Sequence, residues 1–203
     1  MAKYLSVKLS QFKSFAVPLV KRRTKLSFIR RLAKNTRLLD VGCGNDSPFR
    51  IKLQRPDVFM SGLILIIKTK REMFIAGLTS ISWPHPRNFP GKIESFSNTF
   101  DAVLCAHNPE HCDDPDAVLN AILKSLKKGG RLYLSFPSEK SLSLPKRAPL
   151  NFYDDPTHKA PPNFDKTINA IRAAGLEIDF AKKQYRPGAL RAGVSPRTVL
   201  LSY

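Results

Sequence analysis

The chain has 203 residues, a formal net charge of +18 and an isoelectric point near 10.1. This length is enough for one domain with a substantial core and excludes a second folded domain of ordinary size. Every apolar run is shorter than the about 20 residues that span a membrane, and the basic N-terminus lacks the pattern of a signal peptide. We therefore expect a cytoplasmic protein, with Cys43, Cys105 and Cys112 as reduced thiols because their spacing is unpaired.

The first segment, residues 1–35, is basic and carries interleaved apolar side chains. Eleven Lys and Arg residues precede Asp40, with no acidic residue among them. We expect a helical segment here, with its helix near residues 9–33, packed on a domain formed by residues 36–203. Because clustered positive charge attracts phosphate groups, the segment is interpreted as a peripheral contact with an anionic membrane, with nucleic acid as the rival partner. A solvated helix that covers the sheet edge is the alternative without any ligand.

A short buried strand, expected over residues 37–41, runs directly into a glycine turn with the sequence LLDVGCGN at residues 38–45. Glycine has no Cβ, so Gly42 and Gly44 can adopt positive φ and leave space for a ligand against the main chain. Such a turn after a strand indicates a nucleotide-like cofactor. Asp46 and Ser47 stand where the dinucleotide-binding pattern has its third glycine.

The rest of the chain alternates between strands and helices. Further strands are expected near residues 58–66, 100–106, 131–136, 176–185 and 197–203, and further helices near 116–127 and 164–174. Gly129 and Gly130 are expected to end the first of these helices, and Asn163 to cap the second. This alternation predicts an α/β fold with a mainly parallel sheet and helices on both faces. In such sheets ligands bind outside the carboxyl ends of the strands.

Three sequence blocks in this order and spacing carry a resemblance to a known family: LLDVGCGN (38–45), FDAVLCAHNPEHCDDP (100–115) and LKSLKKGGRLYLSFP (123–137). Over roughly residues 36–180 the chain resembles the class I S-adenosylmethionine-dependent methyltransferases. The resemblance implies a Rossmann-like, doubly wound, mainly parallel seven-stranded sheet in a single domain, and S-adenosyl-L-methionine as cofactor. The stretch NFYDDPTHKAPPNFDKTINAIRAAGLEI (151–178) resembles small methyltransferases associated with bacterial surface-glycan biosynthesis.

The resemblance places the cofactor against Asp40, Gly42, Cys43, Gly44, Asn45, Ile64, Asp101, Ala106 and His107. Asp40, Gly42 and Gly44 would hold the amino-acid end of the cofactor, and residues 101–107 would pass near its reacting end. Asp40 has the alternative role of fixing the turn through the loop amides. Ile64 stands where the family has an acid that hydrogen-bonds the ribose hydroxyls, so we expect weak cofactor binding; unpaired buried hydroxyls cost about 1–3 kcal/mol.

Histidines are the candidate general bases, which methyl transfer needs only when the acceptor is a hydroxyl. His158 is the first candidate, with Asp154 or Asp155 to orient it, and His107 is the second; a structural hydrogen bond is the alternative role of each. No metal is expected, because the possible ligands Cys105, His107, His111 and Cys112 belong to separate elements.

These observations favour a methyltransferase that uses S-adenosylmethionine to O-methylate a sugar or another small-molecule or glycan precursor. A nucleic-acid methyltransferase is one alternative; the charge favours it, but the chain lacks the Asn/Asp-Pro-Pro-Tyr type of motif that holds a flipped base. The other alternative is a degenerate methyltransferase fold that binds a partner without catalysis, which Ile64 permits. The methyl acceptor and the oligomeric state are left open by the sequence.

Overall fold

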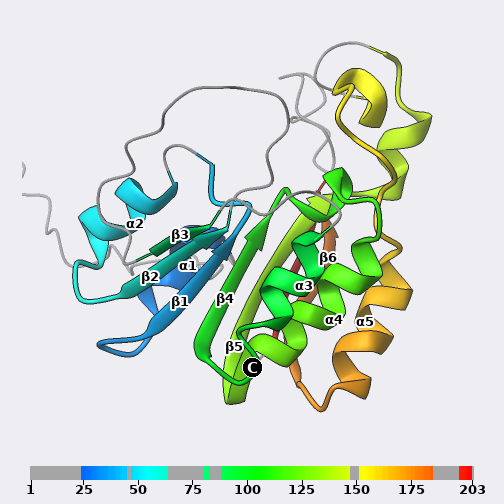
Figure 1. Ribbon diagram of the computed structural model, residues 1–203. Helices are drawn as coiled ribbons and strands as arrows, with labels where there is room; N and C mark the ends of the chain where they lie inside the picture. The colour runs from blue at the N-terminus through cyan, green and yellow to red at the C-terminus, as the bar shows by residue number, and fades with distance from the viewer. Residues whose placement is uncertain are drawn as a thin grey trace, which may run out of the picture.

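The computed structural model describes residues 24–44, 47–63, 80–82, 88–146, 151–184 and 197–202. Within them, seven strands form one sheet in the order β3-β2-β1-β4-β5-β7-β6 (Figure 1). The strands are β1 (Arg37–Val41), β2 (Phe59–Leu63), β3 (Ser80–Ser82), β4 (Phe100–Ala106), β5 (Leu126–Pro137), β6 (Ile178–Gln184) and β7 (Arg197–Ser202). Strands β1 to β5 pair in parallel, whereas β7 pairs antiparallel with β5 and β6. The mainly parallel, doubly wound sheet predicted from the sequence is confirmed.

Helices cover both faces of this sheet. The described helices are α1 (Lys25–Arg30), α2 (Ser47–Gln54), α3 (Phe89–Glu94), α4 (Pro115–Ser125) and α5 (Phe164–Ala173), with short 3-10 turns η2 (Pro109–His111), η3 (Glu139–Ser143) and η4 (Phe152–Asp154). In Figure 1, α3, α4 and α5 lie together over one face, next to β4 and β5. Ile29 of α1 and Ile51 of α2 belong to a separate core on the other face. The strand order reverses between β1 and β4, and ligands bind beside such a point in open α/β sheets.

Strand β1 contributes to both cores, because its side chains alternate between the two faces. Leu39 and Val41 pack in the core that contains Ile122 of α4, whereas Leu38 packs with Met60 in the core beneath α1 and α2. All three β1 side chains are completely buried. Packing on both faces makes β1 a rigid support for the glycine turn that follows it.

The helix predicted to end at Gly129 and Gly130 ends earlier, so that expectation was wrong. Helix α4 ends at Ser125, and β5 begins at Leu126 and continues through both glycines. Gly129 has a φ of +75°, and the pairing of β4 with β5 shifts register between Phe100 and Ala102. The glycines therefore accommodate an irregularity inside a strand, a role that glycine also has in sheets.

The described part of the N-terminal segment begins at Thr24, which caps α1. Phe28, Ile29 and Leu32 are buried in the core that contains Leu38. Residues 1–23, with most of the helix predicted near 9–33, lie outside the described residues, so the division of the chain at residue 35 stays a prediction. Elements α2, α3 and β3 were not predicted, because each is short and α2 and α3 have weak apolar periodicity. No helix in the described ranges is long and apolar enough to cross a membrane.

Candidate functional site

The turn after β1 has the backbone shape that its glycines predict. Gly42 and Gly44 have φ values of +75° and +48°, in the left-handed region that favours glycine. The amides of Gly42 and Cys43 donate to the carbonyl of Leu63, at 2.8 and 3.2 Å. The turn is thus fixed against the carboxyl end of β2.

The two glycines of this turn have different surroundings. A Cβ at Gly42 would lie 2.5 Å from Nδ2 and 2.6 Å from Cβ of Asn108, which is buried after β4. A Cβ at Gly44 would meet no atom of the described residues within 4 Å. Gly42 therefore allows two loops to pack together, whereas Gly44 leaves open space beside the main chain. This open space fits the approach of a cofactor to the backbone.

Asp40 is buried and is tied to two helices through its side chain. Ser47, the first residue of α2, donates its hydroxyl to Oδ2 of Asp40 at 2.5 Å, and Lys25 of α1 donates to the same hydroxyl oxygen at 2.6 Å. Burial raises the pKa of Asp40, and the charge of Lys25 and the bond from Ser47 partly offset this rise. These contacts support the role of Asp40 in fixing the region of the turn.

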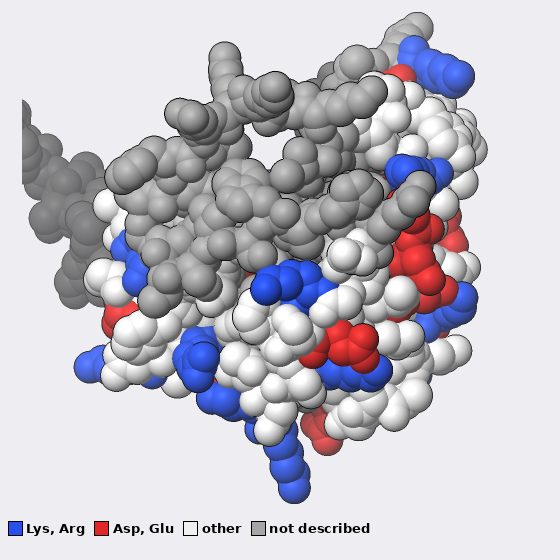
Figure 2. All heavy atoms as spheres, viewed as in Figure 1, with Lys and Arg blue, Asp and Glu red and all other residues white. Residues whose placement is uncertain are grey.

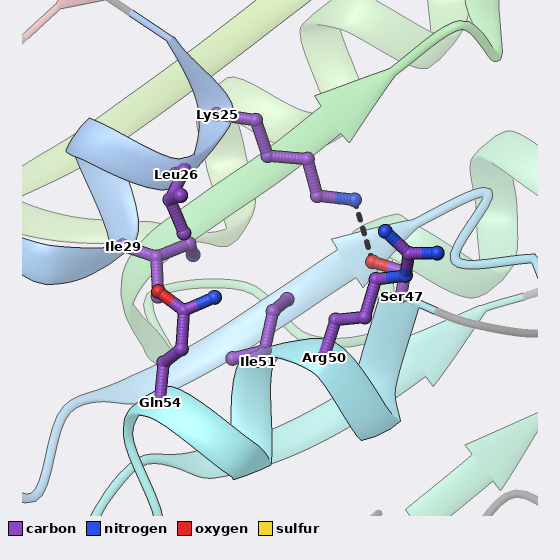
Figure 3. A pocket seen from close by; sticks show the side chains of 7 residues that line it. All are labelled: Lys25, Leu26, Ile29, Ser47, Arg50, Ile51 and Gln54. Atoms are coloured by element: carbon purple, nitrogen blue, oxygen red, sulfur yellow. Dashed lines mark hydrogen bonds between the residues drawn. The ribbon is translucent and has the colours of Figure 1, made fainter.

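A cavity of about 430 Å³ lies between α1 and α2, next to Ser47. Figure 3 shows Lys25 reaching across it from α1 to Ser47, with Arg50 and Ile51 on the α2 side. The link of Lys25 and Ser47 to Asp40 was not predicted, because it depends on how α1 and α2 pack.

The cysteines of the described chain are free and buried, in agreement with the expectation of reduced thiols. Burial raises the pKa of Cys43 and of Cys112 to about 12 each, and that of Cys105 well above its ordinary value. A thiol needs a lowered pKa to act as a nucleophile near neutral pH. Cys43 therefore contributes packing and backbone to the turn, not thiolate chemistry.

The end of β4, beside the glycine turn, carries His107. Its φ is +55°, and its amide donates to the carbonyl of Ser135 at 2.8 Å. Nδ1 of His107 lies 3.1 Å from Oε1 of Glu110, a carboxylate in η2 that is completely buried, while the His107 side chain is 37% exposed. Ala106, half-buried, precedes it at the last position of β4. An imidazole held by a carboxylate on one nitrogen has its other nitrogen available for chemistry.

His158 lies in a second group of side chains close by. Its Nδ1 is 2.6 Å from the carbonyl of Phe152, and its ring packs against the rings of His111 and Phe152, with centroids 4.7 and 4.5 Å away. Asp155 Oδ2 is 3.7 Å from Nε2 of His158, which is beyond hydrogen-bond length. Asp154 instead accepts from the amide of Asn151, at 2.8 Å, and so completes the capping box of η4, whose N-cap residue is Asn151.

Asp101 does not belong to this site, contrary to the sequence expectation. It is the second residue of β4, at the opposite end of the strand from His107. Its carboxylate accepts from Lys127 at 2.7 Å and from the amide of Arg37 at 2.8 Å. The family block runs along the whole strand, and only its carboxyl end reaches the site. Asn45 and Ile64 lie outside the described residues.

Sequence reasoning missed two residues of the site, Asn108 and Glu110. Both are in the block that carries the resemblance, but their type and spacing gave no sign of a role. Glu110 in particular is a completely buried acid, which is rare in proteins unless the charge has a partner.

A profile of the family described as "Methyltransferase domain" matches residues 13–180. With the sheet order and the glycine turn described above, this match shows that the chain belongs to the class I S-adenosylmethionine-dependent methyltransferase family.

Two relatives are named ubiquinone biosynthesis O-methyltransferase. The protein of Xanthomonas axonopodis pv. citri is 28% identical over 181 residues, which cover 80% of this chain and 72% of the relative. That of Xanthomonas oryzae pv. oryzae is 29% identical over 103 residues, 49% of this chain. This second match spans only 42% of the relative's length.

Solved structures of methyltransferases share the fold. A SAM-dependent methyltransferase from Archaeoglobus fulgidus superposes with a TM-score of 0.58 and 18% identity, covering 83% of this chain and 86% of that one. Aeropyrum pernix fibrillarin, in complex with natively bound S-adenosyl-L-methionine, has a TM-score of 0.52 and 13% identity, covering 84% and 67%. At these identities the likeness concerns the fold alone.

Proposed function

We propose that this methyltransferase transfers a methyl group from S-adenosyl-L-methionine to a hydroxyl of a small molecule, such as a sugar of a glycan precursor. The observation that carries the proposal is the juxtaposition of an open glycine turn after β1 with a carboxylate-bound histidine after β4. The curated relatives, named as O-methyltransferases, support the hydroxyl as acceptor.

The glycine turn would hold the cofactor, which supplies a methyl group on a sulfonium when bound. The open side of Gly44 lets a ligand approach the main chain, and the contacts of Gly42 and Cys43 with Leu63 keep the turn in place. Asp40 and Ser47 hold the turn and the start of α2 in a fixed relation. A pre-formed turn favours binding because less conformational freedom is lost.

His107 is the better candidate for the general base of the two histidines predicted from the sequence. In the neutral tautomer whose Nδ1 proton bonds to Oε1 of Glu110, Nε2 of His107 carries the lone pair that can take a proton from a hydroxyl. The His107 side chain is 37% exposed, against 14% for His158. A base must reach the acceptor oxygen within about 3 Å, which favours the more accessible ring.

Calorimetry with S-adenosylhomocysteine tests the cofactor half of the proposal. Gly44→Val should abolish binding by filling the open space. Gly175→Val is the matched control: Gly175 also has positive φ, at +81°, and open space around it, but it follows α5, away from the turn. Equal loss in both variants would mean that backbone strain, not the space at Gly44, matters. If the wild type fails to bind at about millimolar concentration, which corresponds to about −4 kcal/mol, the non-catalytic alternative holds.

Transfer of a labelled methyl group to a panel of hydroxyl compounds tests the acceptor half. With the acceptor found, His107→Ala should lower turnover by about 10²-fold or more, because general bases contribute about 10²–10⁴. S-adenosylhomocysteine affinity should be unchanged, and added imidazole should restore part of the turnover. Wild-type turnover in His107→Ala would remove this residue from the mechanism.

Contact of residues 1–23 with an anionic membrane is a separate proposal, supported by the charge of that segment alone. Figure 2 shows basic side chains beside acidic ones on one face of the molecule. Among the described residues, Lys159 pairs with Asp113, and Lys166 of α5 pairs with Asp116 of α4. A protein lacking residues 1–23 should lose salt-sensitive sedimentation with anionic vesicles. Thr24 is the right boundary, since Phe28 and Ile29 are part of the core.

A further inference from the structure

Three side chains next to His107 present ligand atoms to a common point. Glu110, His111 and His158 each offer one carboxylate oxygen or ring nitrogen, and these atoms all lie within 4.8 Å of one another. Glu110 and His111 come from η2, and His158 follows η4. The amide of Lys159 donates to the carbonyl of Glu110 at 2.8 Å, and this bond joins the two segments.

The hydrogen bonds around the two histidines determine which nitrogen of each ring is free. The Thr157 hydroxyl donates to Asp155 at 2.6 Å, so its oxygen accepts the Nδ1 proton of His111 at 2.9 Å. Nδ1 of His158 must donate to the carbonyl of Phe152, since a carbonyl can only accept. In the neutral form of each ring, Nε2 therefore carries the lone pair. Metal-binding histidines are oriented in the same way, with the other nitrogen donating to a carbonyl or another oxygen.

The carboxylate of Glu110 has one oxygen occupied and one without a partner. Oε1 accepts from His107, whereas Oε2 is buried and makes no hydrogen bond within the described residues. Buried charged oxygens in folded proteins almost always have a donor or a cation beside them. The ligand atoms of His111 and His158 lie within 4.8 Å of that of Glu110, and a neutral ring whose Nδ1 donates elsewhere has no second proton to offer this oxygen. A cation between the three atoms would satisfy all of them at once.

We propose that Glu110, His111 and His158 bind a divalent transition-metal ion. Two imidazole nitrogens and one carboxylate oxygen suit Zn²⁺ or Mn²⁺ better than Ca²⁺ or Mg²⁺, which prefer oxygen ligands. Asp155, whose Oδ2 is 3.7 Å from Nε2 of His158, adds negative charge beside the site. From the sequence no metal was expected, because Cys105, His107, His111 and Cys112 belong to separate elements. The set proposed here keeps only His111 of these four residues and adds Glu110 and His158.

An ion held by three protein atoms keeps coordination positions open for water or for an oxygen of another molecule. Oε1 of Glu110 contacts His107, and Oε2 would bind the ion. One carboxylate would therefore contact both the proposed base and the ion. An acceptor hydroxyl bound to the ion would lose its proton to His107 more readily, because metal ions lower the pKa of bound hydroxyl groups. Only this last step rests on the proposed function.

Metal binding can be measured without cofactor or acceptor, so a failure here is distinct from a failure of methyl transfer. Full-length protein is treated with chelator, and ZnCl₂ and MnCl₂ are titrated in separate calorimetry runs. We expect one ion per chain for the wild type, and at least tenfold weaker binding for His158→Ala and Glu110→Gln. Asp113→Asn, an exposed acid three residues from Glu110, is the matched control and should bind as the wild type does.

Thermal unfolding with and without the ion guards against variants that fail to fold. The ion should raise the melting temperature of the wild type and of Asp113→Asn, since a ligand that binds only the folded state stabilises it. At the same ion concentration, the increase should be smaller for a folded His158→Ala variant, because that variant binds the ion more weakly. The proposal is overturned if the wild type binds neither ion stoichiometrically, or if folded His158→Ala and Glu110→Gln bind as tightly as the wild type.

Discussion

The ends of β1 and β4 lie side by side in the sheet but offer different chemistry. After β1 the chain presents backbone, shaped by Gly42 and Gly44, with Asp40 buried beneath it. After β4 it presents ionisable side chains, His107 and Glu110, joined to His158 from a distant segment. The first arrangement suits a ligand recognised by shape, and the second suits proton transfer and cation binding. Under the proposed function, cofactor binding and proton transfer would therefore belong to the ends of two neighbouring strands.

Gly42→Ala tests whether the two ends depend on each other, and it has the largest expected effect. The new methyl group would collide with the side chain of Asn108, and the alanine backbone would have to keep the left-handed φ of Gly42. We therefore expect the free energy of unfolding to fall by about 2–4 kcal/mol. Gly44→Ala makes no such collision with the described residues, so only the unfavourable left-handed φ should lower its free energy of unfolding, by about 1–2 kcal/mol. Urea denaturation of both variants measures the difference. Equal losses would show that the two loops do not contact each other as described.

Asn108→Gly in the background of Gly42→Ala sharpens this test. Removing the side chain that the new methyl group meets should recover the part of the loss that exceeds the Gly44→Ala value. If the double variant is no more stable than Gly42→Ala alone, the contact with Asn108 is not the cause.

Ile64→Asp tests whether the proposed cofactor site lacks a hydrogen-bond acceptor for the ribose hydroxyls. β2 ends at Leu63, whose carbonyl anchors the glycine turn, and Ile64 is the next residue in the sequence. A carboxylate there should tighten S-adenosylhomocysteine binding about tenfold by accepting from the ribose hydroxyls. Phe59→Asp, the control, adds the same charge at the other end of β2 and should leave the affinity for S-adenosylhomocysteine unchanged. Unchanged or weaker binding by Ile64→Asp would place the ribose elsewhere.

Lys25→Met tests the electrostatic support of Asp40 and has the smallest expected effect. Burial raises the pKa of Asp40, so this residue favours folding most at low pH, and its contribution declines as the pH rises through the folded-state pKa. Lys25 offsets part of the decline. The variant should lose about 1 kcal/mol of unfolding free energy at pH 7 and little below pH ~3.5, where Asp40 is protonated in both states.

Arg30→Met removes the same charge from the exposed end of α1 and serves as the control. It should show no comparable dependence on pH, because Arg30 bonds to Gln54 and not to the Ser47 hydroxyl. A loss in Lys25→Met that persists undiminished at low pH would point to packing of the Lys25 stem as the cause.

Local patterns explain why the β1 side was predictable. The strand, the acid and the glycines of residues 38–44 act within a few residues of one another, so their sequence is enough to indicate the turn. The cluster of Glu110, His111 and His158 depends on contacts between segments far apart in the sequence. Its members lie together only because the chain after η4 packs against η2, so the sequence pattern did not reveal it. Asp101 shows that a residue of a family motif can lie far from the site, because it is at the amino end of β4 and His107 follows the carboxyl end.

The contact between Gly42 and Asn108 has a thermodynamic consequence. Asn108 follows His107 directly, so a ligand that shifts the glycine turn also shifts the residue next to the proposed base. Suppose that a cofactor bound at the glycine turn changes the affinity for an acceptor or a metal ion at the end of β4 by some factor. The acceptor or metal ion must then change the affinity for the cofactor by the same factor. Cofactor titrations with and without acceptor, and with and without metal, would measure that reciprocity directly.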